Sequence, residues 1–225
     1  MTTTIPTRAQ TRAPVRSPML AWRTPIYQAD FADAGQYNGE LRSMILDAEK
    51  TDTQAANFGG IAAIKSSQSI LRWEHPAIDW LKVKIMDAVT ALTADVLGGA
   101  ASEVTQGVLA EGWAVVYRGG GSLRPHTHHD SAWSGVYYVE SGADPGHVGG
   151  SSSEDAGHLQ MLDPRPAAIA RQASPGVARI EPVPGRMVAF PGWLPHSVQA
   201  TVAGSGLRIC IAWNVAYDKT WKGMS

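Results

Sequence analysis

The sequence predicts a mainly β domain of the α+β class, a barrel or sandwich with helices packed on one face. Glycine and proline, with 23 and 14 of the 225 residues, make up about 16% of the chain against an average near 12%. Eight tryptophans accompany this excess of turn formers. Helical spacing of apolar residues occurs only before residue 100, and short β-rich runs follow it. Because strands and helices do not alternate after that point, a doubly wound parallel sheet is not expected.

Two helices are predicted in the N-terminal half. In residues 38–50, three apolar positions share one stripe at i, i+4 and i+7 spacing: Leu41, Ile45 and Ala48. In residues 77–97, six positions recur at similar spacing: Ile78, Leu81, Ile85, Val89, Leu92 and Val96. Pro76 suits the first turn of the second helix, and Gly98-Gly99 should end it.

The C-terminal half predicts short strands separated by Gly, Pro and Ser clusters. Six runs are β-rich: 113–117, 134–139, 158–162, 178–180, 187–190 and 207–214. The segments 141–157 and 163–177 lack any period and are long for loops inside a compact domain. Such loops are lids over a site or passive insertions, and composition does not decide between the two.

We expect one folded domain preceded by an arm. Residues 1–18 are rich in Thr, Pro, Arg and Ala and offer little to bury, so we expect a disordered arm. Residues 19–225 then form a single domain, with a helical buttress over 19–100 and a β core over 101–225.

Charge, hydropathy and cysteine content exclude several classes of protein. The formal net charge of −1 gives no basic excess for binding nucleic acid, and no run approaches 18 apolar residues, so no membrane helix is expected. The single cysteine, Cys210, rules out an internal disulfide or a CxxC metal site. The absence of a secretory signal favours a cytoplasmic protein, while the sequence leaves homo-oligomer formation open.

The densest group of potential metal ligands is Arg124-Pro-His-Thr-His-His-Asp130. On an extended backbone, His126, His128 and Asp130 project from the same face, and two ligands at i and i+2 can grip one metal ion. About 70 residues downstream, Phe190-Pro-Gly-Trp-Leu-Pro-His196 reads as a strand end and a tight turn that presents one histidine. Two ligands from one strand and one from a distant strand form the facial triad that leaves open positions on Fe(II).

Arg208 is a candidate for holding a carboxylate. Alternation along 207–214 places Arg208, Cys210, Ala212 and Asn214 on one face, and it places Ile209, Ile211 and Trp213 on a core-packing face. An arginine beside small residues on a strand suits a carboxylate bound by a bidentate fork within a pocket, although a surface ion pair has the same local pattern.

These motifs, taken in order, resemble a bacterial branch of the 2-oxoglutarate/Fe(II) oxygenases. The Tyr117–His126 stretch also resembles the Tyr-x-x-Gly-Gly-x-x-x-Pro-His segment of the prolyl-hydroxylase-like members. The resemblance spans roughly residues 108–216 and rests on six elements: Trp113, Pro125-His126-Thr-His128, Ser134-Gly-Val-Tyr-Tyr-Val139, Asp163-Pro-Arg165, Phe190-Pro-Gly-Trp-Leu-Pro-His196 and Arg208.

The resemblance implies a double-stranded β-helix, or jelly-roll, core with the N-terminal helices buttressing one sheet. It implies Fe(II) held by the histidine pair and His196. It also implies 2-oxoglutarate chelating that iron, with its distal carboxylate on Arg208 and a hydrogen bond from Tyr117. The superfamily motif is usually His-x-Asp/Glu, so a two-residue slide to His128-His129-Asp130 remains open. The branch's own His-x-His element favours His126, with Asp130 then accepting a hydrogen bond from a ligand imidazole.

The implied activity is a dioxygenase, most naturally a hydroxylase, that oxidises a C–H bond of a small metabolite or amino-acid-like substrate. Dioxygen is the second reactant, and succinate and CO2 are released. Arg124 and Trp133 are candidates for the substrate mouth, and packing is the competing role for the tryptophan. Two alternatives stay open: a three-histidine cupin-type dioxygenase that does not use 2-oxoglutarate, and a non-catalytic jelly-roll binding module.

Overall fold

The computed structural model describes the helical segment, the β core and the start and end of each long loop. The described ranges are 23–57, 60–67, 69–98, 107–142, 155–165 and 176–217. The predicted disordered arm, 1–18, lies outside them, as do most of the predicted loops 141–157 and 163–177.

Both predicted helices are confirmed. Helix α1 spans Gly35–Thr51 and α2 spans Pro76–Leu97, with Pro76 in the first turn and Gly98 at the end with a φ of 60°. The apolar stripes of the two helices are buried against the sheet as expected, from Leu41 in α1 to Leu92 in α2. The second stripe stops there: Val96, predicted to belong to it, is 57% exposed. No helix of the described residues is long and apolar enough to span a membrane.

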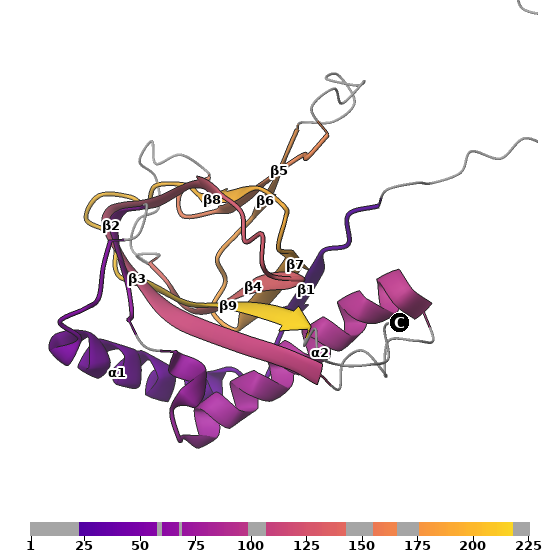
Figure 1. The fold of residues 1–225 in the computed structure, drawn as a ribbon. Coiled ribbons are helices and arrows are strands. Elements are labelled where there is room, and N and C mark those ends of the chain that lie inside the picture. Colours follow the sequence, from indigo (N-terminus) through magenta and orange to yellow (C-terminus); the bar gives the residue numbers. More distant parts are fainter. Residues whose placement is uncertain are drawn as a thin grey trace, which may run out of the picture.

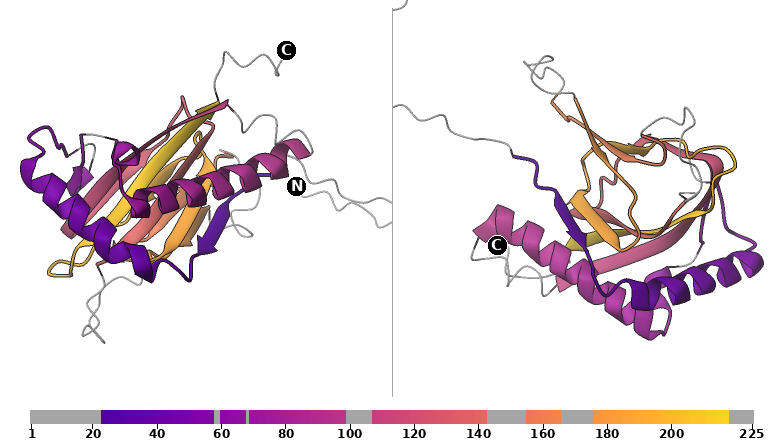
Figure 2. Two further views of the ribbon diagram at one scale, coloured as in Figure 1. Left: turned by 90° about the horizontal axis from the view of Figure 1, so that it is seen from below. Right: turned by 180° about the vertical axis from the view of Figure 1, so that it is seen from behind.

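The described residues form one antiparallel sheet of nine strands that curls into a half-barrel (Figure 1). Its strands are β1 (Tyr27–Asp30), β2 (Gly60–Lys65), β3 (Val108–His126), β4 (Trp133–Ser141), β5 (Leu159–Leu162), β6 (Val177–Ile180), β7 (Arg186–Pro191), β8 (His196–Val198) and β9 (Arg208–Tyr217). The order is β1-β7-β4-β9-β3-β8-β5-β6, and β2 pairs with β3. Both helices lie on the outer face of the curl (Figure 2), which agrees with the expected jelly-roll with buttressing helices.

The six predicted strands are present, but the first is much longer than predicted. The sequence pattern ends it at Tyr117, whereas β3 continues through three glycines to His126. Gly120 has a φ of 80°, a conformation that glycine adopts without strain. This irregular stretch lets one strand pair with β9 as far as Tyr117 and then with β8 from Leu123. The short strands β1, β2 and β8 lacked a clear alternating pattern and were not predicted.

The two faces of the curled sheet pack into two separate cores. The outer core, against the helices, contains Ile209, Ile211 and Trp213, as the alternation along β9 predicts. The inner core, within the curl, contains Cys210 from the opposite face of that strand. Tyr137 and Tyr138 divide in the same way, with Tyr138 inside. The inner core surrounds the cavity described next.

Candidate metal centre and adjoining cavity

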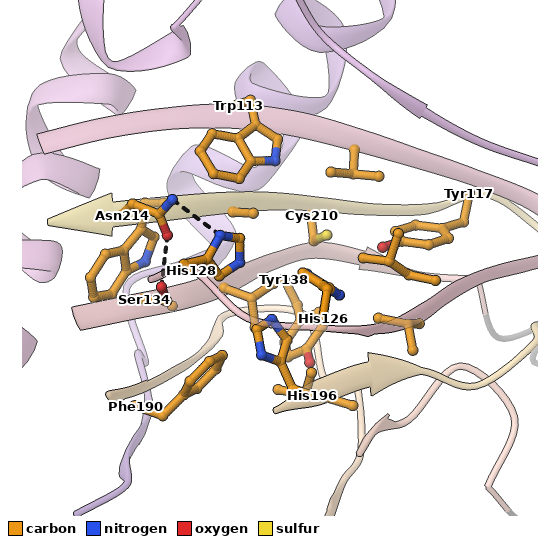
Figure 3. Close-up of a pocket in the computed structure, with 18 of the residues that line it drawn as sticks. Trp113, Tyr117, His126, His128, Ser134, Tyr138, Phe190, His196, Cys210 and Asn214 are labelled. Carbon is orange, nitrogen blue, oxygen red and sulfur yellow. Dashed lines mark hydrogen bonds between the residues drawn. The ribbon is translucent and has the colours of Figure 1, made fainter. Parts of the chain in front are cut away.

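A cavity within the curl contains three histidines that lie together (Figure 3). The ligand nitrogens of His126, His128 and His196 are all within 4.8 Å of one another. No other group of three or more potential ligands occurs in the described ranges. Three imidazoles at this separation suit one first-row transition metal ion bound on a single face.

Strand pairing brings His126 and His196 together. His126 is the last residue of β3, His196 is the first of β8, and the two form a cross-strand pair whose ring centroids are 4.2 Å apart. The Nδ1 atom of His126 lies 2.8 Å from the Arg124 carbonyl, and that of His196 lies 2.9 Å from the Leu194 carbonyl. A carbonyl only accepts, so each Nδ1 donates and each Nε2 is left with its lone pair for a metal.

His128 differs from the other two because it lies outside the strand. The predicted extended backbone ends at His126, so shared strand parity does not explain the position of His128. Instead, its backbone N–H donates to the Gly192 carbonyl at 2.7 Å, which fastens the loop after β3 to the turn before β8. Its side chain meets Asn214, whose Nδ2 is 3.3 Å from its Nδ1.

Burial keeps the imidazoles of His128 and His196 uncharged. Burial, with a smaller contribution from His126, lowers the pKa of His128 to about 4, and it lowers the pKa of His196 to about 3. Both rings are therefore neutral at pH 7, and a neutral imidazole offers a lone pair to a metal ion. Phe190 packs its ring against His196, with centroids 4.7 Å apart, and keeps that side of the cluster apolar.

Three sequence candidates lie outside the cluster. Asp130, the alternative ligand, is exposed and does not join the group of close nitrogens. The expected hydrogen bond from a ligand imidazole to Asp130 is also replaced, since each ligand Nδ1 meets another residue. Arg124 is exposed, and neither it nor Trp133 lines the cavity.

Trp133 instead belongs to the outer core. Its Nε1 donates to Tyr217 Oη at 2.7 Å and lies 3.2 Å from Thr93 Oγ1 on helix α2. The competing role, packing between sheet and helix, is the one that the structure gives this tryptophan.

Arg208 lies inside the cavity with no acidic partner. It is 1% exposed, and no carboxylate among the described residues lies within ion-pair distance of its guanidinium. Its Nη1 lies 3.7 Å from Cys210 Sγ, a weak acceptor, and its Nε has no hydrogen-bond partner. A buried, unpaired cation costs several kcal/mol, so the position is suited to an anionic ligand that offsets this cost.

Two tyrosines flank that guanidinium. Its central carbon lies 4.4 Å from the Tyr117 ring centroid and 5.1 Å from that of Tyr138. Burial raises the pKa of Tyr138 to about 12, so its hydroxyl stays protonated and can donate, yet that hydroxyl has no partner. The sequence named Tyr117 here and left the inward tyrosine of the pair 137–138 undecided; the structure places Tyr138 inside.

The donor set therefore fits Fe(II) and 2-oxoglutarate. The three imidazole nitrogens provide a metal site, and the unpartnered donors of Arg208 and Tyr138 suit a carboxylate in the same cavity. The sequence did not single out Ser134 or treat Asn214 as part of the site, although both line the cavity beside His128 (Figure 3). The sequence did indicate that Asn214 lies on the same strand face as Arg208, and this pattern could have included Asn214 in the predicted site.

A family model matches the part of the chain that builds this cavity. Residues 111–214 match the family described as "Putative 2OG-Fe(II) oxygenase". The matched segment includes the three histidines and Arg208. Among curated proteins, no match to the chain was found.

Solved structures share the fold over most of the chain. A prolyl-4-hydroxylase from Pseudomonas putida is 18% identical with a TM-score of 0.60, and the alignment covers 86% of this chain and 92% of that one. A prolyl hydroxylase from Trichoplax adhaerens, in complex with a hypoxia-inducible-factor peptide, is 15% identical with a TM-score of 0.58 and coverage of 89% and 86%. HygX from Streptomyces hygroscopicus, with nickel, 2-oxoglutarate and hygromycin B bound, is 12% identical with a TM-score of 0.57 and coverage of 87% and 84%.

Proposed function

Residues 111–214 of this chain belong to the 2-oxoglutarate/Fe(II) oxygenase family, and from that premise we propose that the enzyme hydroxylates a C–H bond of a small metabolite or amino-acid-like substrate. Succinate and CO2 are the co-products. The observation that carries the proposal is a three-histidine cluster beside a buried arginine without an acidic partner, both in one cavity.

The three histidines hold the iron in this proposal. His126 and His196 offer their Nε2 atoms because backbone carbonyls occupy both Nδ1 atoms, and His128 completes the triad from the loop after β3. A facial triad leaves coordination positions for a cosubstrate and dioxygen. When bound, Fe(II) and 2-oxoglutarate together supply the oxidising chemistry, and the protein supplies binding and orientation.

Arg208 and its two tyrosines anchor the distal carboxylate of 2-oxoglutarate. The guanidinium offers Nε, and Tyr138 offers a hydroxyl that burial keeps protonated. Tyr117 closes the other side of the guanidinium. Apolar inner-core residues around these donors exclude water, which strengthens a charge-assisted hydrogen bond.

Trp113 is the best candidate for contact with the substrate. Its half-buried indole lines the cavity, and its centroid is 6.1 Å from that of His128. Lys65 Nζ lies 3.7 Å from the centroid of the same indole ring. Trp113 thus replaces Trp133 in the proposed substrate mouth, and Arg124, which is exposed and outside the cavity lining, is the weaker candidate.

The test begins with cosubstrate binding. The protein is mixed anaerobically with Fe(II) and 2-oxoglutarate, and the weak visible charge-transfer band that requires both on one site is recorded. His196→Ala should abolish the band by removing a ligand, and Arg208→Met should require far more 2-oxoglutarate. Arg186→Met is the matched control, since Arg186 lies on β7 of the same sheet but pairs with Asp30 at 2.7 Å.

Turnover identifies the reaction. Succinate release is measured across a panel of amino acids and other small metabolites, and mass spectrometry of the substrate should show one added oxygen. Metal binding and oxygen uptake that are independent of 2-oxoglutarate would support the cupin-type dioxygenase instead. Absence of both the band and any metal-dependent stabilisation would support the non-catalytic binding module.

A further inference from the structure

We propose that Asn214, held in a row with Glu111 and Ser134, is the positioning residue for the His128 imidazole and thereby sets the affinity of the metal site. This inference rests on the metal site of the proposed function. Asn214 contacts the His128 side chain and would not contact the metal itself.

The row crosses three neighbouring strands. Glu111 on β3 and Ser134 on β4 are both direct cross-strand partners of Asn214 on β9. Ser134 Oγ donates to Asn214 Oδ1 at 2.7 Å, and Asn214 Nδ2 lies 3.3 Å from both Glu111 Oε1 and His128 Nδ1. Ser134 is 2% exposed and Asn214 is 7% exposed. Buried polar side chains are normally hydrogen-bonded, and both of these are.

His128 needs such an anchor more than the other two histidines do. Strand pairing fixes His126 and His196, because the last residue of β3 and the first residue of β8 lie directly opposite each other. His128 lies in the loop before β4, where its N–H donates to the Gly192 carbonyl and its own carbonyl accepts from Ser131 N–H. These two bonds locate the backbone but leave rotation about χ1 and χ2 open. The contact with Asn214 is the hydrogen bond that fixes the ring (Figure 3).

The amide of Asn214 can serve either neutral form of the ring. With nitrogen toward His128, as in the structure, it donates to an Nδ1 without hydrogen, and the hydrogen of the ring is on Nε2. With oxygen toward His128, it accepts from Nδ1–H and leaves Nε2 to bind metal. The bond to Ser134 survives the exchange, because a hydroxyl both donates and accepts. Metal binding therefore selects the orientation with oxygen toward the ring.

Glu111 opposes that orientation. With oxygen toward His128, the amide of Asn214 would also turn that oxygen toward Glu111 Oε1. Two acceptors repel each other, so Glu111 favours the orientation that places the amide nitrogen there. Replacing Glu111 by glutamine supplies an N–H donor and removes the opposition. The row thus contains both an element that supports metal binding and one that restrains it.

The probe for the test is Co(II), bound without oxygen, with its dissociation constant from competition with a chelator and its visible absorption as a signature of coordination. Asn214→Leu keeps the volume and removes the amide, and it should weaken Co(II) about 10- to 100-fold with a changed spectrum. Asn214→Asp combined with Glu111→Gln presents only acceptors to His128. It should restore affinity to within about threefold of Glu111→Gln alone, a residual near 0.6 kcal/mol.

Two further variants separate positioning from general stability. Thr93→Ala disturbs the buried Thr93–Trp133–Tyr217 contacts on the outer face of the same sheet, so it should lower the melting temperature and leave Co(II) affinity unchanged. Ser134→Ala removes one hydroxyl from the row and should weaken Co(II) by about two- to tenfold, the range of one hydrogen bond. This variant keeps the test decisive if Asn214→Leu does not fold.

Wild-type affinity of both Asn214→Leu and Ser134→Ala would overturn the inference while leaving the metal site intact. A weakened Asn214→Leu that the aspartate variant does not rescue would also overturn it, since packing would then explain the loss. A wild-type protein that binds no Co(II) or Fe(II) would refute the proposed function and this inference together.

Discussion

Replacing Arg208 by methionine should change cosubstrate affinity and apoprotein stability in opposite directions. Arg208 is 1% exposed, its Nε is unpartnered, and its Nη1 donates to a cysteine sulfur, a weak acceptor. Methionine is unbranched, of similar reach and uncharged, so it fills the same space without a buried charge. The apoprotein should therefore keep its stability or gain up to about 4 kcal/mol, as when buried ionic groups are replaced by apolar ones.

The same change should severely weaken 2-oxoglutarate. Loss of one partner of a buried charge pair costs about 2–5 kcal/mol, which corresponds to roughly a 30- to 4,000-fold rise in the dissociation constant. Metal affinity should stay within a few-fold of wild type, because Arg208 does not contact the histidine cluster. A saturating ligand at 100 times its dissociation constant stabilises a protein by about 2.7 kcal/mol, so adding 2-oxoglutarate at that level should raise the melting temperature of the wild type much more than that of Arg208→Met.

The assay combines calorimetric titration of the Fe(II)-loaded protein with 2-oxoglutarate, without oxygen, and melting curves with and without the cosubstrate. Arg186→Met is the control: it loses a surface ion pair with Asp30 and should show unchanged cosubstrate affinity. An Arg208→Met protein that binds 2-oxoglutarate like the wild type would refute the anchor. An apoprotein destabilised by several kcal/mol would refute the claim that the guanidinium lacks a partner within the fold.

Three further outcomes follow from the site and its walls. His126→Ala should lose Fe(II), whereas Asp130→Ala should bind it within about threefold of wild type because Asp130 is exposed and outside the cluster; chelator competition measures both, and the reverse pattern would move the site. Tyr138→Phe removes an unpartnered hydroxyl, so calorimetry should show apo stability retained and 2-oxoglutarate weakened about three- to tenfold; unchanged affinity would exclude that hydroxyl as a donor. Gly135→Ala should cost about 1–3 kcal/mol in denaturant unfolding, since its Cβ would overlap the Trp213 ring, whereas Gly39→Ala on the open surface of α1 should add about 0.5–1 kcal/mol; equal effects would contradict the packing.

The sequence predicted those features that a regular period determines. Helical spacing located both helices, and alternation along β9 correctly assigned Arg208 and Ile209 to opposite faces. The length of β3 escaped prediction because its three glycines match a turn as well as a strand, and only pairing with β2 and β8 decides between them. A pattern of two-residue period also cannot show which face of Tyr137-Tyr138 is inner, since both positions are aromatic and buried.

The same limit explains why the clustered histidines were predicted while the residues that contact them were not. A histidine is noticed by its type, and His-x-His with a distant histidine is a rare spacing, so the three candidate ligands can be recognised from one sequence. Asn214 and Ser134 are common residues 80 positions apart, and they bond only because β4 and β9 pair in one register. Register depends on every contact along both strands, which no local pattern contains. His128 illustrates this limit. Its parity with His126 predicted that the two histidines lie together, and they do, but the strand ends at His126 and an amide from another strand orients the His128 ring.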